Sequence, residues 1–269
     1  KRHLPIRKVN GRSYDSHDNM PIARHRPRVC VPGAGLGRLA LEVCSVGYEV
    51  QGNEVSLHML LASDFILNGS LSPSRPFVIS PWFTESRNIN KCFDPARKIE
   101  IPDVNPVEML TNGEDRQPDF SMVAGDFISI YSNPNQHQKW DCVACCFFLD
   151  TAPCIVEYLQ VIYDMLDDDG LLINIGPLLY HWSGPTYRPD EKDESTYQTK
   201  HNHLDDKYMK SVDMCWDDVR TCMLNIGFTF LEENERVPCK YTDDRTSLQS
   251  TLFDCLFFVA KKETRDHHR

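Results

Sequence analysis

The chain has 269 residues, of which 41% are hydrophobic and 25% are charged, as is usual for soluble globular proteins. This length suits one large domain or one domain with insertions. The net charge of −10 argues against a general nucleic-acid binder and against a protein that binds anionic membranes. No apolar run approaches the length of a membrane span and no signal peptide is visible, so we expect a location in the cytoplasm, and also in the nucleus.

Residues 1–28 are expected to form a basic arm. They carry eight Lys or Arg residues against Asp15 and Asp18, and they show no hydrophobic period. A flexible tail is the simplest interpretation, and contact with phosphate groups is the alternative.

Strand-like and helical segments alternate after this arm, which predicts an α/β fold with a mostly parallel sheet covered by helices on both faces. The expected strands are 28–31, 48–54, 120–127, 140–150, 171–175, 228–232 and 252–261, of which the last two form an antiparallel pair. The expected helices are 38–45, 56–68, 151–166 and 212–226, the last of which ends at Gly227.

Two polar stretches, 69–118 and 176–211, interrupt the alternation and are too long to be ordinary loops. We predict that they are insertions that flank one pocket at the carboxyl edge of the sheet. The domain then spans 29–262 and leaves 263–269 as a C-terminal tail.

Eleven cysteines lie in apolar, strand-like segments rather than at the spacings of a disulfide framework. We therefore expect reduced, buried thiols. Cys142 and Cys145 have C-x-x-C spacing, but no second pair follows them, so we expect no zinc site and no other metal.

The segment VCVPGAGLGRL, residues 29–39, joins the first expected strand to the first helix. Gly33, Gly35 and Gly37 let the backbone pass close to a ligand, and the start of the helix offers free N–H groups. The NAD fingerprint places Gly or Ala where Arg38 stands, so the loop is closer to the version that binds S-adenosylmethionine. A tight turn without a ligand is the alternative.

Two acidic residues follow the next strands toward the same edge. Glu54 lies 17 residues after Gly37, where nucleotide-binding folds place a carboxylate that accepts hydrogen bonds from ribose hydroxyls; the alternative is a surface glutamate. Asp126 is expected at the adenine amino group, with Phe127 packed beside the adenine ring. Its alternative role is that of a helix N-cap.

Asp150 and His181 are the candidates for chemistry. Asp150 ends the most apolar strand-like segment and emerges at the carboxyl edge, although Thr151 after it also permits a helix-capping role. His181 follows the strand at 171–175 and faces the same edge, although a lone histidine is more often structural.

Six segments within residues 28–262 carry a resemblance to a known family: VPGAGLGRLA, GYEVQGNE, FSMVAGDF, CCFFLDTA, INIGPLLYHW and DCLFFVA. They closely resemble the carnosine N-methyltransferases, which carry an N2227-like domain. The resemblance implies a class I, Rossmann-like methyltransferase fold with a seven-stranded sheet and S-adenosylmethionine as the cofactor. It also implies methyl transfer to an imidazole nitrogen of carnosine, β-alanyl-L-histidine, which gives anserine.

The resemblance also assigns roles to individual residues. It implies cofactor contacts for Gly33, Glu54, Asp126, Phe127 and Cys146. Asp150 and His181 match the residues that hold the substrate imidazole, so we expect Asp150 to accept the ring N–H and His181 to orient the ring or accept its proton. Tyr241 and Phe253 are expected beside the substrate, although the family has tyrosine where Phe253 stands.

Residues 1–28 do not match the helical segment that closes over the cofactor in this family. Two alternatives therefore stay open: methylation of histidine in other peptides or proteins, and cofactor binding without catalysis. A closed pocket between the two insertions would favour a dipeptide, and an open-ended pocket would favour a longer chain. We expect no nucleic-acid or membrane partner, and whether the protein forms a homodimer is left open.

Overall fold

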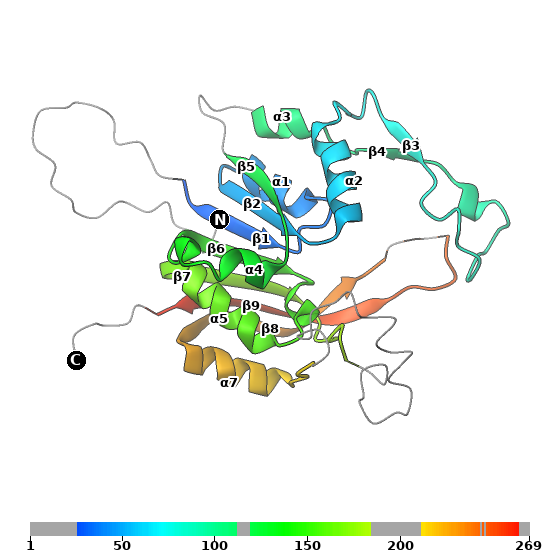
Figure 1. Ribbon diagram of the computed structural model, residues 1–269. Coiled ribbons are helices and arrows are strands. Elements are labelled where there is room, and N and C mark those ends of the chain that lie inside the picture. The colour runs from blue at the N-terminus through cyan, green and yellow to red at the C-terminus, as the bar shows by residue number, and fades with distance from the viewer. Residues whose placement is uncertain (1–25, 112–118, 184–210, 243, 245, 264–269) are drawn as a thin grey trace, which may run out of the picture.

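The computed structural model describes residues 26–111, 119–183, 211–242, 244 and 246–263 (Figure 1). Most of the basic arm, the end of the first predicted insertion, most of the second and the C-terminal tail lie outside these residues. Within the described part of the chain, no helix is both long and apolar enough to cross a membrane.

A seven-stranded sheet forms the centre of the fold, in the order β5-β2-β1-β6-β7-β9-β8. Its parallel strands are β1 (Arg28–Pro32), β2 (Glu49–Glu54), β5 (Phe120–Ala124), β6 (Trp140–Cys146) and β7 (Leu166–Gly176). The last strands, β8 (Phe228–Lys240) and β9 (Leu252–Lys262), are antiparallel to each other, and β9 is antiparallel to β7. This confirms the predicted sheet, and the strand order reverses between β1 and β6, where open α/β sheets bind ligands.

Helices cover both faces of this sheet (Figure 1). They are α1 (Arg38–Ser45), α2 (Leu57–Asn68), α3 (Pro106–Thr111), α4 (Phe127–Tyr131), α5 (Ile155–Met165) and α7 (Trp216–Ile226). Ser56 caps α2 by accepting a hydrogen bond from the N–H of Met59. Gly227, with φ of 120°, ends α7 as predicted.

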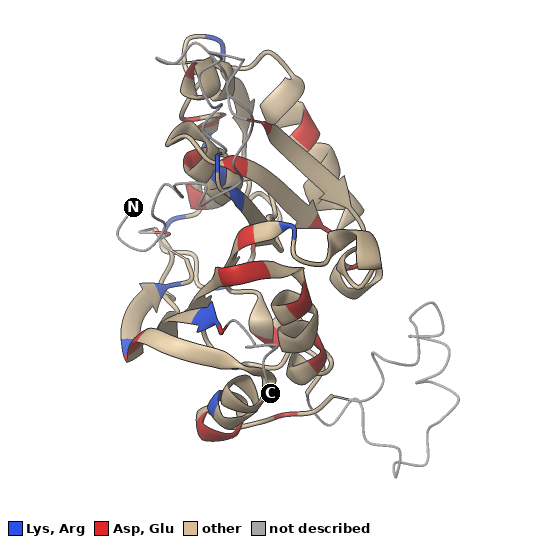
Figure 2. Ribbon diagram, turned by 90° about the vertical axis from the view of Figure 1, so that its left-hand side faces the viewer, with Lys and Arg blue, Asp and Glu red and all other residues tan. Residues whose placement is uncertain are grey.

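Two separate apolar cores explain this layering. Successive side chains of a strand point to opposite faces, so Val29 and Val31 pack with α1 on one side, whereas Cys30 packs with α4, α5 and α7 on the other. The central strands are buried on both faces and therefore read as nearly continuous apolar segments. Figure 2 shows that acidic residues are spread over the helices and strands rather than gathered in one patch.

Two expected strands are shorter than predicted. β5 ends at Ala124, because Gly125 adopts φ of 147° and Asp126 caps α4. β6 ends at Cys146, because Phe147 turns the chain with φ of 52°. Asp150 therefore lies in a single 3₁₀ turn, η3 (Leu149–Thr151), and not at the end of a strand.

The other differences concern element starts and lengths. α5 begins at Ile155 rather than at residue 151, since Pro153 disfavours helical backbone at the residue before it. α7 begins at Trp216 rather than at residue 212.

Two strands are longer than predicted. β7 already begins at Leu166, and its register with β6 then shifts, so that residues 167–170 bulge out of the ladder. β8 runs eight residues beyond its predicted end at 232, to Lys240.

The described part of the first insertion is folded rather than irregular. β3 (Phe77–Ile79) pairs antiparallel with β4 (Ile99–Ile101), and the short 3₁₀ helix η1 (Asp94–Ala96) lies between them. Arg38, at the start of α1, forms an ion pair of 2.6 Å with Asp103 of this insertion. The insertion therefore contacts the start of α1, which follows the carboxyl end of β1, and the pocket expected between the two insertions stays a prediction.

Candidate active site

The glycine loop between β1 and α1 adopts backbone that favours glycine at three positions. Gly33, Gly35 and Gly37 have φ of 63°, 56° and 85°. A Cβ at position 33 would lie 2.7 Å from the ring of Phe148, whereas a Cβ at position 35 would meet no atom within 4 Å. The loop is thus packed on its Gly33 side and faces open space at Gly35, which leaves room for a ligand.

Glu54, at the end of β2, is fixed beside this loop by three backbone donors. Its Oε2 accepts a hydrogen bond from the N–H of Gly35 at 2.8 Å. Its Oε1 accepts from the N–H groups of Val55 and Ser56 at 2.9 and 2.8 Å. A carboxylate has about four acceptor sites, so Glu54 keeps the capacity to bind a hydroxyl group. The position predicted for a ribose contact therefore lies next to the open side of the loop.

Asp126 lies after the neighbouring strand β5 and caps α4. Its Oδ1 accepts hydrogen bonds from the N–H and the hydroxyl of Ser129 at 3.0 and 2.8 Å. The structure thus contains the N-cap role that was the alternative at this position. The adenine contact expected for Asp126 stays a prediction.

The ring of Phe127 belongs to the core. It is buried, and its centroid lies 5.2 Å from that of Phe148 and 5.0 Å from that of Tyr158. Because the ring of Phe148 also packs under Gly33, Phe127 supports the glycine loop through Phe148. Packing of the Phe127 ring against adenine remains a prediction.

Asp150 is the buried carboxylate of this edge, with 2% of its surface exposed. Its Oδ2 accepts a hydrogen bond from the N–H of Leu179 at 3.1 Å, and its carbonyl accepts from the N–H of His181 at 3.0 Å. Burial raises the pKa of Asp150, and the Leu179 N–H and the nearby His181 oppose this shift. The structure thus brings Asp150 and His181 together, and His181 is exposed to solvent.

Three aromatic rings pack together after the end of β6, where Phe147 stands three residues before Asp150 in the chain. The centroids of Phe147, Tyr241 and Phe253 lie 5.8 to 6.0 Å apart in each pair. Tyr241 and Phe253 are brought together at the turn end of the β8–β9 hairpin, where the N–H of Tyr241 donates to the carbonyl of Thr251 at 3.0 Å. Sequence reasoning did not single out Phe147, although its place three residues before Asp150 was the available signal.

Cys146 lies at the end of β6, next to Phe147. Desolvation and the neighbouring Cys239 raise the pKa of its thiol. Burial, with Cys239 as a second cause, also raises the pKa of Cys255 to about 12. These thiols are therefore protonated near neutral pH and are poor nucleophiles. All eleven cysteines are free, but only five are buried, so the expectation of generally buried thiols was wrong for the others.

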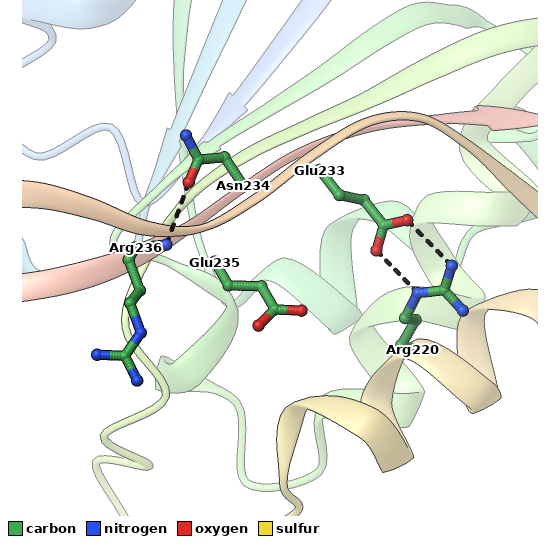
Figure 3. A pocket seen from close by; sticks show the side chains of 5 residues that line it. All are labelled: Arg220, Glu233, Asn234, Glu235 and Arg236. Atoms are coloured by element: carbon green, nitrogen blue, oxygen red, sulfur yellow. Dashed lines mark hydrogen bonds and ion pairs between the residues drawn. The ribbon is translucent and has the colours of Figure 1, made fainter.

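The larger cavities in the described part of the chain include two that lie away from the predicted site residues. One, of about 620 Å³, lies beside α7 and the edge strand β8 and is lined by charged and amide groups (Figure 3). In it Arg220 forms two hydrogen bonds to the carboxylate of Glu233, at 2.8 and 3.0 Å, and Asn234 accepts from the N–H of Arg236. The other is an apolar groove of about 700 Å³ between α2, α3 and β5. Neither contains a predicted site residue.

The sequence model of a family described as "Carnosine N-methyltransferase" matches residues 12–264. Carnosine N-methyltransferase of Mus musculus is 37% identical over 247 residues, which are 91% of this chain and 54% of that protein. The homologue of Schizosaccharomyces pombe is 34% identical and covers 89% of this chain and 60% of that protein. The chain spans about half the length of the curated relatives it matches.

Solved methyltransferase structures are more distant. An S-adenosylmethionine-dependent methyltransferase from Methanosarcina mazei is 12% identical with a TM-score of 0.49, and the match covers 93% of this chain and all of that one. Because the family match starts at residue 12, part of the arm that we expected to lie outside the family pattern lies within it. The match over 253 residues shows that this chain belongs to the carnosine N-methyltransferase family.

Proposed function

We propose that the protein is an S-adenosylmethionine-dependent N-methyltransferase that methylates an imidazole nitrogen of carnosine and produces anserine. The observation that carries this proposal is the place of Asp150: a buried carboxylate just after β6, the strand that neighbours β1 and its glycine loop, and three residues after Phe147, whose ring packs with Tyr241 and Phe253. Family membership supports the reaction class and the choice of acceptor.

The residues around the glycine loop fit the nucleoside part of the cofactor. Glu54 is fixed where it can accept a hydrogen bond from a ribose hydroxyl, and Gly35 faces open space beside the loop. When bound, S-adenosylmethionine supplies a methyl group on a sulfonium that is already an excellent leaving group. The protein therefore needs to align the acceptor nitrogen with that methyl group and to exclude water.

The surroundings of Asp150 fit a neutral imidazole ring that becomes a cation when it is methylated. Only an unprotonated ring nitrogen can attack, so the ring proton must stay on the other nitrogen. Asp150 accepts that N–H, which fixes the tautomer, and its negative charge stabilises the positive charge that develops on the ring. The aromatic rings of Phe147, Tyr241 and Phe253 pack together, with Phe147 near this carboxylate in the chain, and an aromatic face favours the same cation. His181 orients the ring or accepts its proton.

Three further assignments belong to this proposal. The methyltransferase domain spans 29–262, between the arm 1–28 and the tail 263–269. Its partner is a small dipeptide, with no nucleic acid or membrane. Eleven free cysteines support a location in the cytoplasm or the nucleus.

Incubation of the protein with S-adenosylmethionine and carnosine, followed by mass analysis, tests the proposal. We expect carnosine to gain one methyl group and to comigrate with anserine. A histidine-containing peptide in a parallel reaction separates a dipeptide enzyme from one that acts on longer chains. Binding of S-adenosylmethionine in calorimetry without methylation of either acceptor would contradict the proposal and indicate a non-catalytic protein.

A further inference from the structure

The first insertion is fastened to the tip of the β8–β9 hairpin by a group of four side chains, which we call the clasp: Trp82, Arg97, Asp244 and Thr246. Arg97 Nη1 lies 2.7 Å from Asp244 Oδ1 and also donates to the hydroxyl of Thr246. The guanidinium carbon of Arg97 lies 3.5 Å from the centroid of the Trp82 ring. The side chains of Arg97 and Asp244 are only 23% and 15% exposed, so their ion pair is partly shielded from water.

A second set of contacts joins the same two segments. The N–H of Leu248 donates to the carbonyl of Asn88 at 2.8 Å, and Ile89 forms an antiparallel bridge with Ser247. The amide of Asn88 also donates to Gln249 at 2.6 Å. The β3–β4 sheet and the β8–β9 hairpin extend to the same side of the molecule (Figure 1). The first insertion and the hairpin therefore share an extended interface rather than a contact between one pair of residues.

Asp244 serves both sides of this interface. Its Oδ1 accepts hydrogen bonds from the N–H and hydroxyl of Thr246, at 2.9 and 2.8 Å, and these bonds shape the turn of the hairpin. The same oxygen receives Arg97. Loss of the Arg97 cation therefore removes the link to the insertion and also alters the surroundings of the carboxylate that shapes the turn.

The hairpin needs such support because it extends beyond the sheet. β9 pairs with β7 only as far as Leu256, so residues 252–255 have β8 as their one strand neighbour among the described residues. An isolated two-stranded ribbon is marginally stable in water. Phe253 and Tyr241 lie at the outer end of this part, next to the turn that carries Asp244 and Thr246.

We propose that Arg97 is a positioning residue for the acceptor site: through the clasp it holds the hairpin so that Tyr241 and Phe253 stay against Phe147. This inference rests on the proposed function and adds that the first insertion controls the binding of the imidazole substrate. Arginine suits the task because its planar cation stacks on Trp82 while its N–H groups bind Asp244 and Thr246. A lysine could keep the ion pair but not the stacked, two-acceptor arrangement.

The test compares Arg97→Met and Arg97→Lys with the control Arg87→Met. Arg87 lies in the same insertion, but its side chain is 86% exposed and its ion pair is with Glu85, at 3.8 Å, within the insertion. We expect the KM for carnosine to rise roughly tenfold in Arg97→Met, the scale of losing one hydrogen bond to a charged group, with little change in kcat. Arg97→Lys should recover part of this loss, and Arg87→Met should behave as the wild type.

Hydrogen exchange of amides 241–251 provides a readout that does not depend on activity. In Arg97→Met we expect faster exchange there, with unchanged exchange in β1 and β6 and unchanged affinity for S-adenosylhomocysteine. Unchanged exchange in the hairpin, or an unchanged KM despite faster exchange, would overturn the inference. Absence of turnover in the wild type would instead overturn the proposed function, since the exchange measurement reports on the clasp separately.

Discussion

The backbone N–H of Leu179 donates a hydrogen bond of 3.1 Å to the buried carboxylate of Asp150. This donor is uncharged and occupies one acceptor site, so the carboxylate keeps its charge and its remaining acceptor capacity for a substrate. A buried carboxylate paired with a fixed cation would already be compensated. Asp150 is instead held in place with its negative charge still available to an imidazolium.

Asp150→Asn tests this relationship. The variant keeps the size of the side chain but can present an N–H where an acceptor is needed, so the substrate tautomer would be wrong and the product cation would lose its partner. We expect normal folding, near-normal binding of S-adenosylmethionine, and a kcat/KM for carnosine that falls roughly 10²–10⁴-fold. Asp254→Asn is the control, because Asp254 lies on the hairpin next to Phe253 but is exposed and contacts Arg236 at 3.8 Å. Near-wild-type turnover of Asp150→Asn would rule out the mechanism.

His181→Ala should reduce kcat/KM less than Asp150→Asn does. Both residues act on one imidazole ring, so the double variant should lose less than the product of the two single effects. Steady-state kinetics of the four proteins measures this coupling. Fully multiplicative losses would show that His181 acts on a different step or a different group.

The raised pKa of Asp150 predicts how stability depends on pH. Burial lets the folded protein keep the Asp150 proton to a higher pH than the unfolded chain, whose aspartate pKa is about 3.9. Between these two pKa values the unfolded state binds fewer protons, so this group makes the free energy of unfolding fall as pH rises. Urea unfolding at a series of pH values should show the wild type losing stability relative to Asp150→Asn across this window. A relative gain with rising pH would mean that hydrogen bonds outweigh burial at Asp150.

Glu54→Ala should weaken binding of S-adenosylhomocysteine by ~1–3 kcal/mol, the scale of hydrogen bonds to a charged group. This loss of affinity has two sources. The variant removes the acceptor proposed for the ribose hydroxyls, and it also removes the acceptor of the Gly35 N–H, which helps to fix the glycine loop. Glu42→Ala is the control: Glu42 lies on α1 and pairs with Arg38 at 2.8 Å on the surface. Titration calorimetry gives both affinities, and NAD should bind poorly to either protein. Unchanged affinity in folded Glu54→Ala would remove this residue from the cofactor site.

Gly33→Ala and Gly35→Ala should affect different properties. Both place a side chain at positive φ, which costs about 1–2 kcal/mol. At position 33 the new methyl group also meets the Phe148 ring at 2.7 Å, so thermal unfolding should show the larger destabilisation there. At position 35 the methyl group enters open space, so cofactor affinity should fall more than stability. Equal loss of affinity and stability in Gly35→Ala would show that the space above position 35 is not used by the cofactor.

Local signals in the sequence were sufficient for the elements that build the sheet. The apolar strand followed by glycines predicted β1, the loop and α1, and the alternation of segments predicted the order of layers. The errors lie where single residues turn the chain. Phe147 adopts positive φ, which is unusual for an aromatic residue and has no local sequence signal, so the predicted strand ran through to Asp150.

Contacts between distant segments were also missed. Arg97 and Thr246 are 149 positions apart, and nothing in either segment by itself indicates the other. β8 was predicted too short because its outer half, residues 233–240, is rich in charged residues and contains Pro238, and it is held by pairing with β9 rather than by burial. The roles proposed for Asp150 and His181 rest on their place at the carboxyl edge and on the family resemblance together.

The start of the second insertion is attached to the turn after β6 at three points: Leu179 N–H to the Asp150 carboxylate, His181 N–H to the Asp150 carbonyl, and the Trp182 indole N–H to the Thr151 carbonyl. Two of these bonds involve only backbone donors, so they survive most side-chain substitutions. Substitutions in the hairpin or the clasp therefore leave the attachment between residues 150 and 181 in place. An engineered exchange of hairpin residues can thus be designed without redesigning the turn that carries Asp150.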